Sequence, residues 1–151
     1  TDHALLACCS RLLALRARWP ALRSGQWLSP PHDSAGVASA QWLRADGTEL
    51  AGADWHDSTE RALAVRLHTG QAQDAVALIL LNADTGDRLF MLSPAHWQCV
   101  FDSDAADGSP CPGRSASLPH ALTLAGRSLC VLVDSVCGHA LLTNAAERAR
   151  P

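Results

Sequence analysis

Paired carboxylates are the residues of this chain whose types and spacing could carry chemistry. Three pairs stand close in the sequence: Asp54 with Asp57, Asp102 with Asp104, and Asp46 with Glu49. Retaining glycoside hydrolysis, for example, requires two carboxylates about 5 Å apart, one of them with a raised pKa. Each pair, however, lies in a turn-like stretch, where Asp commonly caps or closes a turn. We therefore expect structural roles for all three pairs and predict no catalytic residue.

Metal and nucleotide chemistry also lack support. The seven histidines are dispersed, and neither an H-x-x-x-H pair nor a Cys/His array occurs, so no metal site and no cofactor are predicted. The six cysteines form no C-x-x-C pair, and four of them lie in apolar runs, where a thiol packs as a small hydrophobe. No G-x-S-x-G, Walker-type loop or G-x-G-x-x-G sequence is present.

Five tryptophans in a chain without tyrosine are the one feature that indicates sugar binding. An exposed indole face can stack against the C–H face of a pyranose. Trp55, in a loop between two aspartates, is the candidate for contact with substrate, and a buried anchor of that loop is the favoured alternative. Trp42 and Trp97 lie in strand-like runs and are expected in the core. Trp19 and Trp27 are expected to seal a junction between helix and sheet.

The composition predicts one globular domain. The 151 residues (16.0 kDa) are 48% apolar and 18% charged, which is within the range of folded domains. A net charge of −3 without basic runs argues against nucleic acid as a partner. No stretch reaches the roughly 20 apolar residues that cross a bilayer, and no leader is recognisable, so we expect no membrane contact and a cytoplasmic location.

Residues 1–18 are predicted to form a helix that ends before Pro20. Its polar residues fall on one stripe, and apolar residues cover most of the remaining circumference, more than the roughly 100° arc that a surface helix buries on its own domain. We therefore expect partners on two sides of this helix. Four residues are candidates for contact with another domain: Leu5, Leu12, Leu15 and Trp19.

The rest of the chain predicts a mainly β domain. Residues 24–40 are rich in Ser, Gly, Pro and Ala and are expected to form a connection. Short apolar segments separated by turns then follow: 41–44, 62–67, 76–82, 88–92, 97–101, 122–124 and 128–134. The continuous apolar runs 76–81 and 129–133 are typical of central strands. The predicted fold is an antiparallel β-sandwich of about seven or eight strands preceded by one long helix.

Three blocks of sequence resemble the C-terminal region of bacterial glycogen-debranching enzymes, which are isoamylase-like members of the α-amylase superfamily. They cover residues 12–23 (LLALRARWPALR), residues 42–50, 54–57 and 61–67 (WLRADGTEL, DWHD, RALAVRL), and residues 80–83, 89–92 and 127–129 with Trp97 and Asp102. The first block resembles the last helix of the catalytic barrel, with Trp19 in place of the usual His. Ser93-Pro94 departs slightly from the family's pattern, and residues after Asp134 match nothing.

The resemblance implies that the parent enzyme hydrolyses α-1,6 branches in glycogen or its limit dextrins. It also implies that the catalytic carboxylates belong to an upstream barrel. The expected organisation is a final barrel helix and its exit at 1–23, a connection at 24–40, a β-sandwich at 41–134 and an uncertain tail at 135–151. The implied role is a non-catalytic module that stabilises the barrel of its own chain. Binding of branched α-glucan, or self-association through the helix, remain alternatives.

Overall fold

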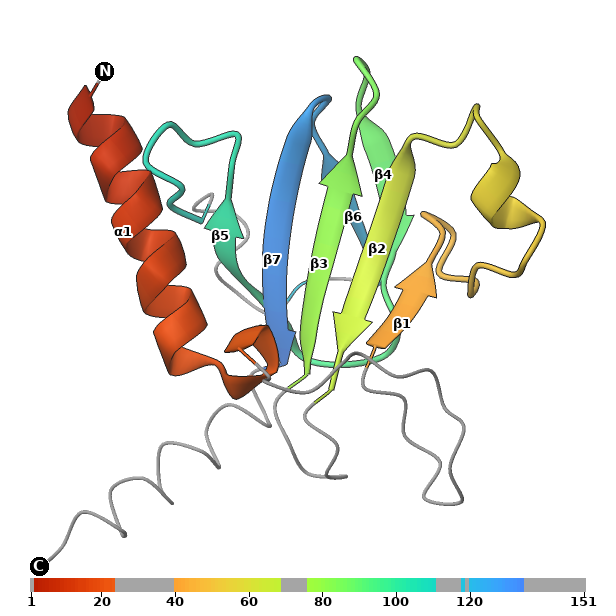
Figure 1. The fold of residues 1–151 in the computed structure, drawn as a ribbon, viewed down its shortest axis with the longest axis horizontal. Coiled ribbons are helices and arrows are strands. Elements are labelled where there is room, and N and C mark those ends of the chain that lie inside the picture. The colour runs from red at the N-terminus through yellow and green to blue at the C-terminus, as the bar shows by residue number, and fades with distance from the viewer. Residues whose placement is uncertain (1, 24–39, 69–75, 111–117, 119, 135–151) are drawn as a thin grey trace, which may run out of the picture.

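The structure, a computed structural model, describes residues 2–23, 40–68, 76–110, 118 and 120–134. It begins with helix α1 (Asp2–Arg18) and the 3-10 turn η1 (Pro20–Arg23), and a second 3-10 turn, η2 (Asp54–His56), lies between the first two strands (Figure 1). The strands are β1 (Ala40–Leu43), β2 (Ala62–Leu67), β3 (Ala77–Asn82), β4 (Arg88–Met91), β5 (Trp97–Asp102), β6 (Ala121–Leu124) and β7 (Ser128–Asp134). The predictions for Trp27, for the connection and for the tail lie outside the described residues.

The strands form two antiparallel sheets. The larger has the order β1-β2-β3-β7-β5, and the smaller pairs β4 with β6. The mainly β fold with an N-terminal helix is therefore confirmed, and seven strands lie within the described residues. β3 and β7 stand inside the larger sheet, as their unbroken apolar runs predicted, because such strands are covered on both faces.

The main core lies between the two sheets. Strands β2, β3, β5 and β7 contribute their inward side chains, while β4 contributes Phe90 and β6 contributes Leu122 and Leu124. Trp97 is 1% exposed, and its Nε1 donates a hydrogen bond to the backbone oxygen of Ser93 at 2.9 Å. The opposite, outer face of the larger sheet is also apolar, since register aligns Val65 with Ile79 on β3 and Ile79 with Val131 on β7.

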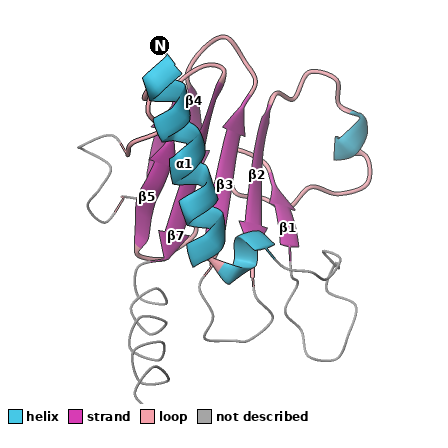
Figure 2. Ribbon diagram, turned by 60° about the vertical axis from the view of Figure 1, so that its left-hand side comes forward, coloured by secondary structure: helices cyan, strands magenta, loops and turns pink. Residues whose placement is uncertain are grey.

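Helix α1 lies beside β5 and β7 and covers only that end of the outer face, as Figure 1 and Figure 2 show. Trp19, directly after the helix, is 7% exposed and packs with Leu15 and Leu22 against Val133 and Val100. Trp19 thus seals the junction between helix and sheet, as predicted. No helix in the described part of the chain is both long and apolar enough to span a membrane.

Turn residues and one buried side chain shape the connections between the strands. The turn at Asp46-Gly47, predicted from its Asp-Gly pair, reverses the chain after β1, and Gly47 has φ of 85°, a conformation that favours glycine. The Asn82 side chain, at the end of β3, links the turn after β3 to the turn before β7. Asn82 therefore joins elements of both sheets.

Candidate functional site

The carboxylates around η2 hold the loop between β1 and β2 in shape. Asp54 accepts a hydrogen bond from the Ala51 backbone N at 2.7 Å and forms an ion pair with Arg44. Asp57 accepts bonds from the backbone N and hydroxyl of Thr59 at 2.9 and 2.6 Å. These contacts are the turn-forming roles that the sequence predicted for this pair.

The electrostatics of these groups oppose acid catalysis. The hydrogen bond from Ala51 is the main cause that lowers the pKa of Asp54, and the side-chain hydrogen bond from Thr59 is the main cause for Asp57. The hydrogen bond from the Thr48 hydroxyl likewise lowers the pKa of Asp46. A general acid of a glycosidase needs the opposite shift. These three carboxylates therefore favour the ionised form, and each accepts a hydrogen bond from a backbone N–H of its own loop.

The Asp102–Asp104 pair also has a structural role. Asp102 is 2% exposed at the end of β5, and its Oδ1 accepts a hydrogen bond from the Asp104 backbone N at 3.1 Å. Farther along this loop the backbone of Gly108, with φ of 71°, lies so close to the Phe101 ring that a Cβ at this position would collide with it. The Asp102 side chain therefore closes the turn after β5 by binding the backbone two residues ahead, as Asp commonly does in turns.

Helix α1 presents two different apolar surfaces. The side facing the sheet carries the half-buried residues Ala4, Cys8, Arg11 and Leu15, which recur at helical spacing. The other side is exposed, and we call it the α1 arc: Leu5, Leu6, Leu12 and Leu13, with 41% to 66% of each residue accessible. No residue of α1 is buried. The surplus apolar arc deduced from the sequence is therefore in contact with solvent.

The four candidate contact residues divide between these surfaces. Leu5 and Leu12 belong to the α1 arc, whereas Leu15 and Trp19 pack on the outer face of the chain's own sheet. Arg11 links the helix to the loop after β5, because its Nε donates a hydrogen bond to the Asp107 backbone oxygen at 3.4 Å. Leu6 and Leu13 complete the arc and were not singled out from the sequence, although a helical wheel places them beside Leu5 and Leu12.

The remaining tryptophans test the expectations for core and surface. Trp97 is in the core as predicted, but the core prediction for Trp42 is wrong, since 37% of it is exposed. Trp42 stands on β1, the edge strand of the larger sheet, and its register partner Val65 shows that it points to the outer face. A strand-like run alone does not distinguish the two faces of an edge strand.

Trp55 is exposed rather than buried beneath its loop. It lies on η2 with 52% of the residue accessible, and its ring meets that of Trp42 edge to face, with centroids 5.6 Å apart. Leaving half of an indole in water forgoes about 2 kcal/mol of burial. The favoured alternative of a buried loop anchor is therefore wrong.

A pocket of about 340 Å³ opens beside Trp55. Leu63 and Leu81, on the outer face of the sheet, line its apolar side. Its charged lining residues are Asp54, Asp57, Glu60 and Arg61. The sequence did not single out Glu60 or Arg61. Their position could have indicated them, because Glu60 and Arg61 directly precede β2 and residues that flank a buried strand lie at the edge of a sheet.

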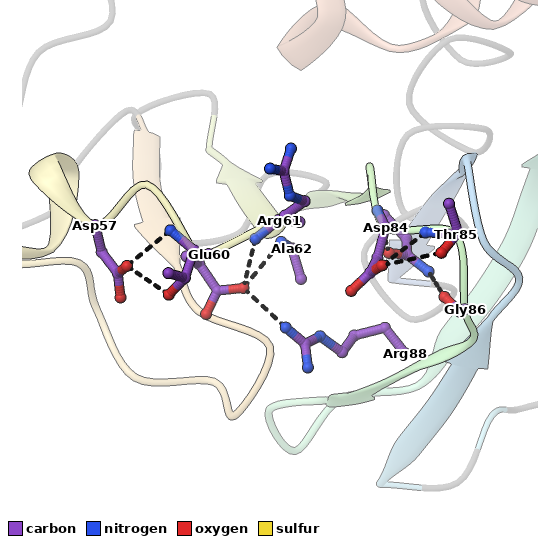
Figure 3. Close-up of polar contacts among 10 residues, drawn as sticks. Asp57, Glu60, Arg61, Ala62, Asp84, Thr85, Gly86 and Arg88 are labelled. Carbon is purple, nitrogen blue, oxygen red and sulfur yellow. Dashed lines mark hydrogen bonds and ion pairs between the residues drawn. The ribbon is translucent and has the colours of Figure 1, made fainter.

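Glu60 at the rim is engaged by the backbone and by Arg88. Oε1 of Glu60 accepts hydrogen bonds from the backbone N of Arg61 and of Ala62, at 3.0 and 2.9 Å, and pairs with Arg88 at 3.3 Å. Figure 3 shows Glu60 reaching toward Arg88, while the Arg61 guanidinium points away from both. The Arg61 guanidinium therefore takes no part in the ion pair between Glu60 and Arg88 (Figure 3).

Two thiols meet in the core. Cys99 on β5 and Cys130 on β7 are buried, and their sulfur atoms are 3.4 Å apart. The prediction that thiols in apolar runs pack as small hydrophobes is confirmed for this pair. Cys9 is exposed on α1, and Cys8 is half-buried. Cys111 and Cys137 lie outside the described residues.

Comparisons with known proteins return structures but no sequence family. No protein-family model matches the chain, and no curated protein matches it. The solved structures that resemble it include the trehalulose synthase MutB from Pseudomonas mesoacidophila MX-45, at 15% identity and a TM-score of 0.46 over 82% of this chain. The α-glucosyl transfer enzyme XgtA resembles it at 21% identity and a TM-score of 0.47 over 85% of this chain. The chain spans 16% and 17% of the length of these two enzymes.

Proposed function

We propose that this chain is the non-catalytic C-terminal β-sandwich module of a glycogen-debranching glycoside hydrolase, and that it stabilises the catalytic barrel by packing against it. The motif resemblance of the three sequence blocks supplies the family. The exposed α1 arc supplies the mode of action. The parent activity, cleavage of α-1,6 branches in glycogen or limit dextrins, belongs to the barrel in this proposal.

The α1 arc is the observation that carries the proposal. Four leucines on one side of a helix are exposed while the other side already packs on the sheet. Fully burying a leucine stabilises by about 1.5–3 kcal/mol, so covering the exposed fractions of four would contribute about 5 kcal/mol. A contiguous exposed apolar patch of this kind marks a contact surface. A barrel whose last helix is α1 would cover the arc with its neighbouring helices.

The test replaces Leu5, Leu6, Leu12 and Leu13 with Ser in the full-length enzyme and in the present chain. In the full-length enzyme we expect the melting temperature to fall by several degrees, because the contact with the barrel is lost. In the present chain the same change should lower the melting temperature clearly less, because these side chains mostly face water and only the lower helix propensity of Ser and the buried part of Leu12 are lost.

The matched control replaces Leu89 and Met91 with Ser. Both are about half exposed on β4, in the smaller sheet, whereas α1 lies beside β5 of the larger sheet (Figure 1). If the α1 and β4 variants of the full-length enzyme have the same melting temperature, the α1 arc has no special role. The reading frame upstream of Thr1 provides a separate test, since the proposal requires an α-amylase-type barrel there.

Self-association of the isolated chain is a second candidate that the same arc favours, because an uncovered apolar helix face can pair with a copy of itself. Light scattering over a range of concentrations measures it directly. A monomer at every concentration would remove this candidate and leave the docking proposal intact, whereas a dimer that the four serine substitutions dissociate would support it.

A further inference from the structure

The loop that carries Trp55 stands at the edge of the larger sheet opposite to α1. Figure 1 shows α1 beside β5 at one edge, and η2 beyond β1 and β2 at the other. Docking through the α1 arc therefore gives no account of the exposed indole. A function for Trp55 has to come from its own surroundings.

Those surroundings hold the indole in a fixed position. The Asp54 carboxylate closes the backbone of η2 and pairs with Arg44, next to β1, while the Trp42 ring contacts the Trp55 ring edge to face. Thr59 and Asp57 close the following turn. An exposed aromatic ring that is held from behind loses little conformational entropy when a ligand stacks on it, which favours binding.

The charge around the pocket is balanced. Three carboxylates and three guanidiniums stand in and around it. Asp54 pairs with Arg44 and Glu60 pairs with Arg88, while Asp57 and Arg61 line the pocket without an ion pair between them. A balanced rim selects neither a phosphate nor an organic cation, because each needs an excess of the opposite charge. It offers acceptors from Asp57 and donors from Arg61, which suit a neutral ligand rich in hydroxyl groups.

The size and lining of the pocket agree with such a ligand. At about 340 Å³ it falls at the small end of the range for ligand sites, and an apolar floor with a few polar groups is their usual lining. A pyranose has an apolar C–H face and a polar rim of hydroxyls. The Trp55 face and the Leu63 floor match the first, and Asp57 and Arg61 match the second.

We propose that the pocket between Trp55, Asp57 and Arg61 binds a glucose unit of an α-linked glucan, with the pyranose stacked on Trp55 and its hydroxyls bonded to Asp57 and Arg61. A pyranose follows from the chemistry of the pocket. The choice of an α-glucan rests on the proposed function. A module with this pocket would hold branched polymer on its parent enzyme at a site remote from bond cleavage.

The test uses saturation-transfer NMR with maltoheptaose on the intact chain, because this readout follows the sugar and does not depend on tryptophan emission. Transfer is expected for the native chain. Trp55→Ala should weaken binding about tenfold or more, as loss of a central aromatic anchor typically does. Arg61→Ala should also weaken it, and it provides the test if Trp55→Ala does not fold. Leu89→Ala, at a residue exposed to the same degree on β4, is the control and should bind normally.

Three results would overturn the inference. The first is no transfer from maltoheptaose at millimolar sugar, and the second is equal binding by the Trp55→Ala and Leu89→Ala variants. The third is transfer from a β-linked cello-oligosaccharide alone. A domain contact instead of a sugar contact would appear as a lowered melting temperature of full-length Trp55→Ala without sugar binding. The α1 variants do not touch this pocket, so this inference and the docking proposal can fail separately.

Discussion

Replacement of Asn82, a buried polar residue, should destabilise the fold strongly. Asn82 ends β3, is 2% exposed, and directs its amide toward two turns. Its Nδ2 lies 2.9, 3.2 and 3.0 Å from the backbone oxygens of Gly86, Leu124 and Ala125. Its Oδ1 accepts from the Asp84 backbone N at 3.1 Å.

The magnitude follows from these contacts. Asn82→Ala removes both amide hydrogens from three carbonyl oxygens, of which the contact to Leu124 is fully buried. A buried polar group left without its partner costs about 1–3 kcal/mol, and a lost hydrogen bond to Asp84 about 1 kcal/mol more. We expect the free energy of unfolding to fall by about 3 kcal/mol, which is a large share of the 5–15 kcal/mol of a typical domain.

Chemical denaturation followed by circular dichroism measures this change, and Asn82→Asp gives a comparison of almost the same shape. Its carboxylate would face three carbonyl oxygens, so its folded-state pKa should rise above the unfolded value of about 3.9. Its stability should then be highest below that pH and fall as the pH rises toward neutral. A loss below about 0.5 kcal/mol for Asn82→Ala, the range of ordinary surface changes, would refute the reasoning.

Three further predictions concern the same fold. Gly126→Ala would place its Cβ 2.2 Å from a backbone oxygen of the β3–β4 turn and should cost about 1–3 kcal/mol in urea denaturation, whereas Gly86→Ala, with open space around it, should be nearly neutral. Burial lowers the pKa of His68 below 6.5, so stability should be complete above that pH and decline as the pH falls below it; His68→Gln should flatten that decline in urea midpoints. The hydrogen bond from Ala51 lowers the pKa of Asp54 below 3.8, so its contribution is present above that pH and lost in stronger acid, and Asp54→Asn should weaken the acid dependence of thermal melting.

Local pattern determined the elements of this protein with little error. Predicted strands 62–67 and 128–134 coincide with β2 and β7, and the predicted helix ends at the same residue as α1. Period and turn residues suffice for this, because backbone conformation depends mainly on near neighbours along the chain. The apolar surplus on α1 was equally visible, since a helical wheel needs only the order of residues.

Tertiary structure alone decided which of these residues meet and which remain in water. Trp42 and Trp97 occupy similar strand-like runs, yet one is at an edge and the other in the core, because sheet order is set by pairings distant in sequence. The Asn82 bridge to Ala125 spans 43 positions, and the Cys99–Cys130 contact spans 31. The pocket beside Trp55 likewise requires the loop after β1, the start of β2 and the end of β3 to converge. Convergence of this kind depends on which strands pair, and the larger sheet pairs β3 with β7, which are far apart in the sequence.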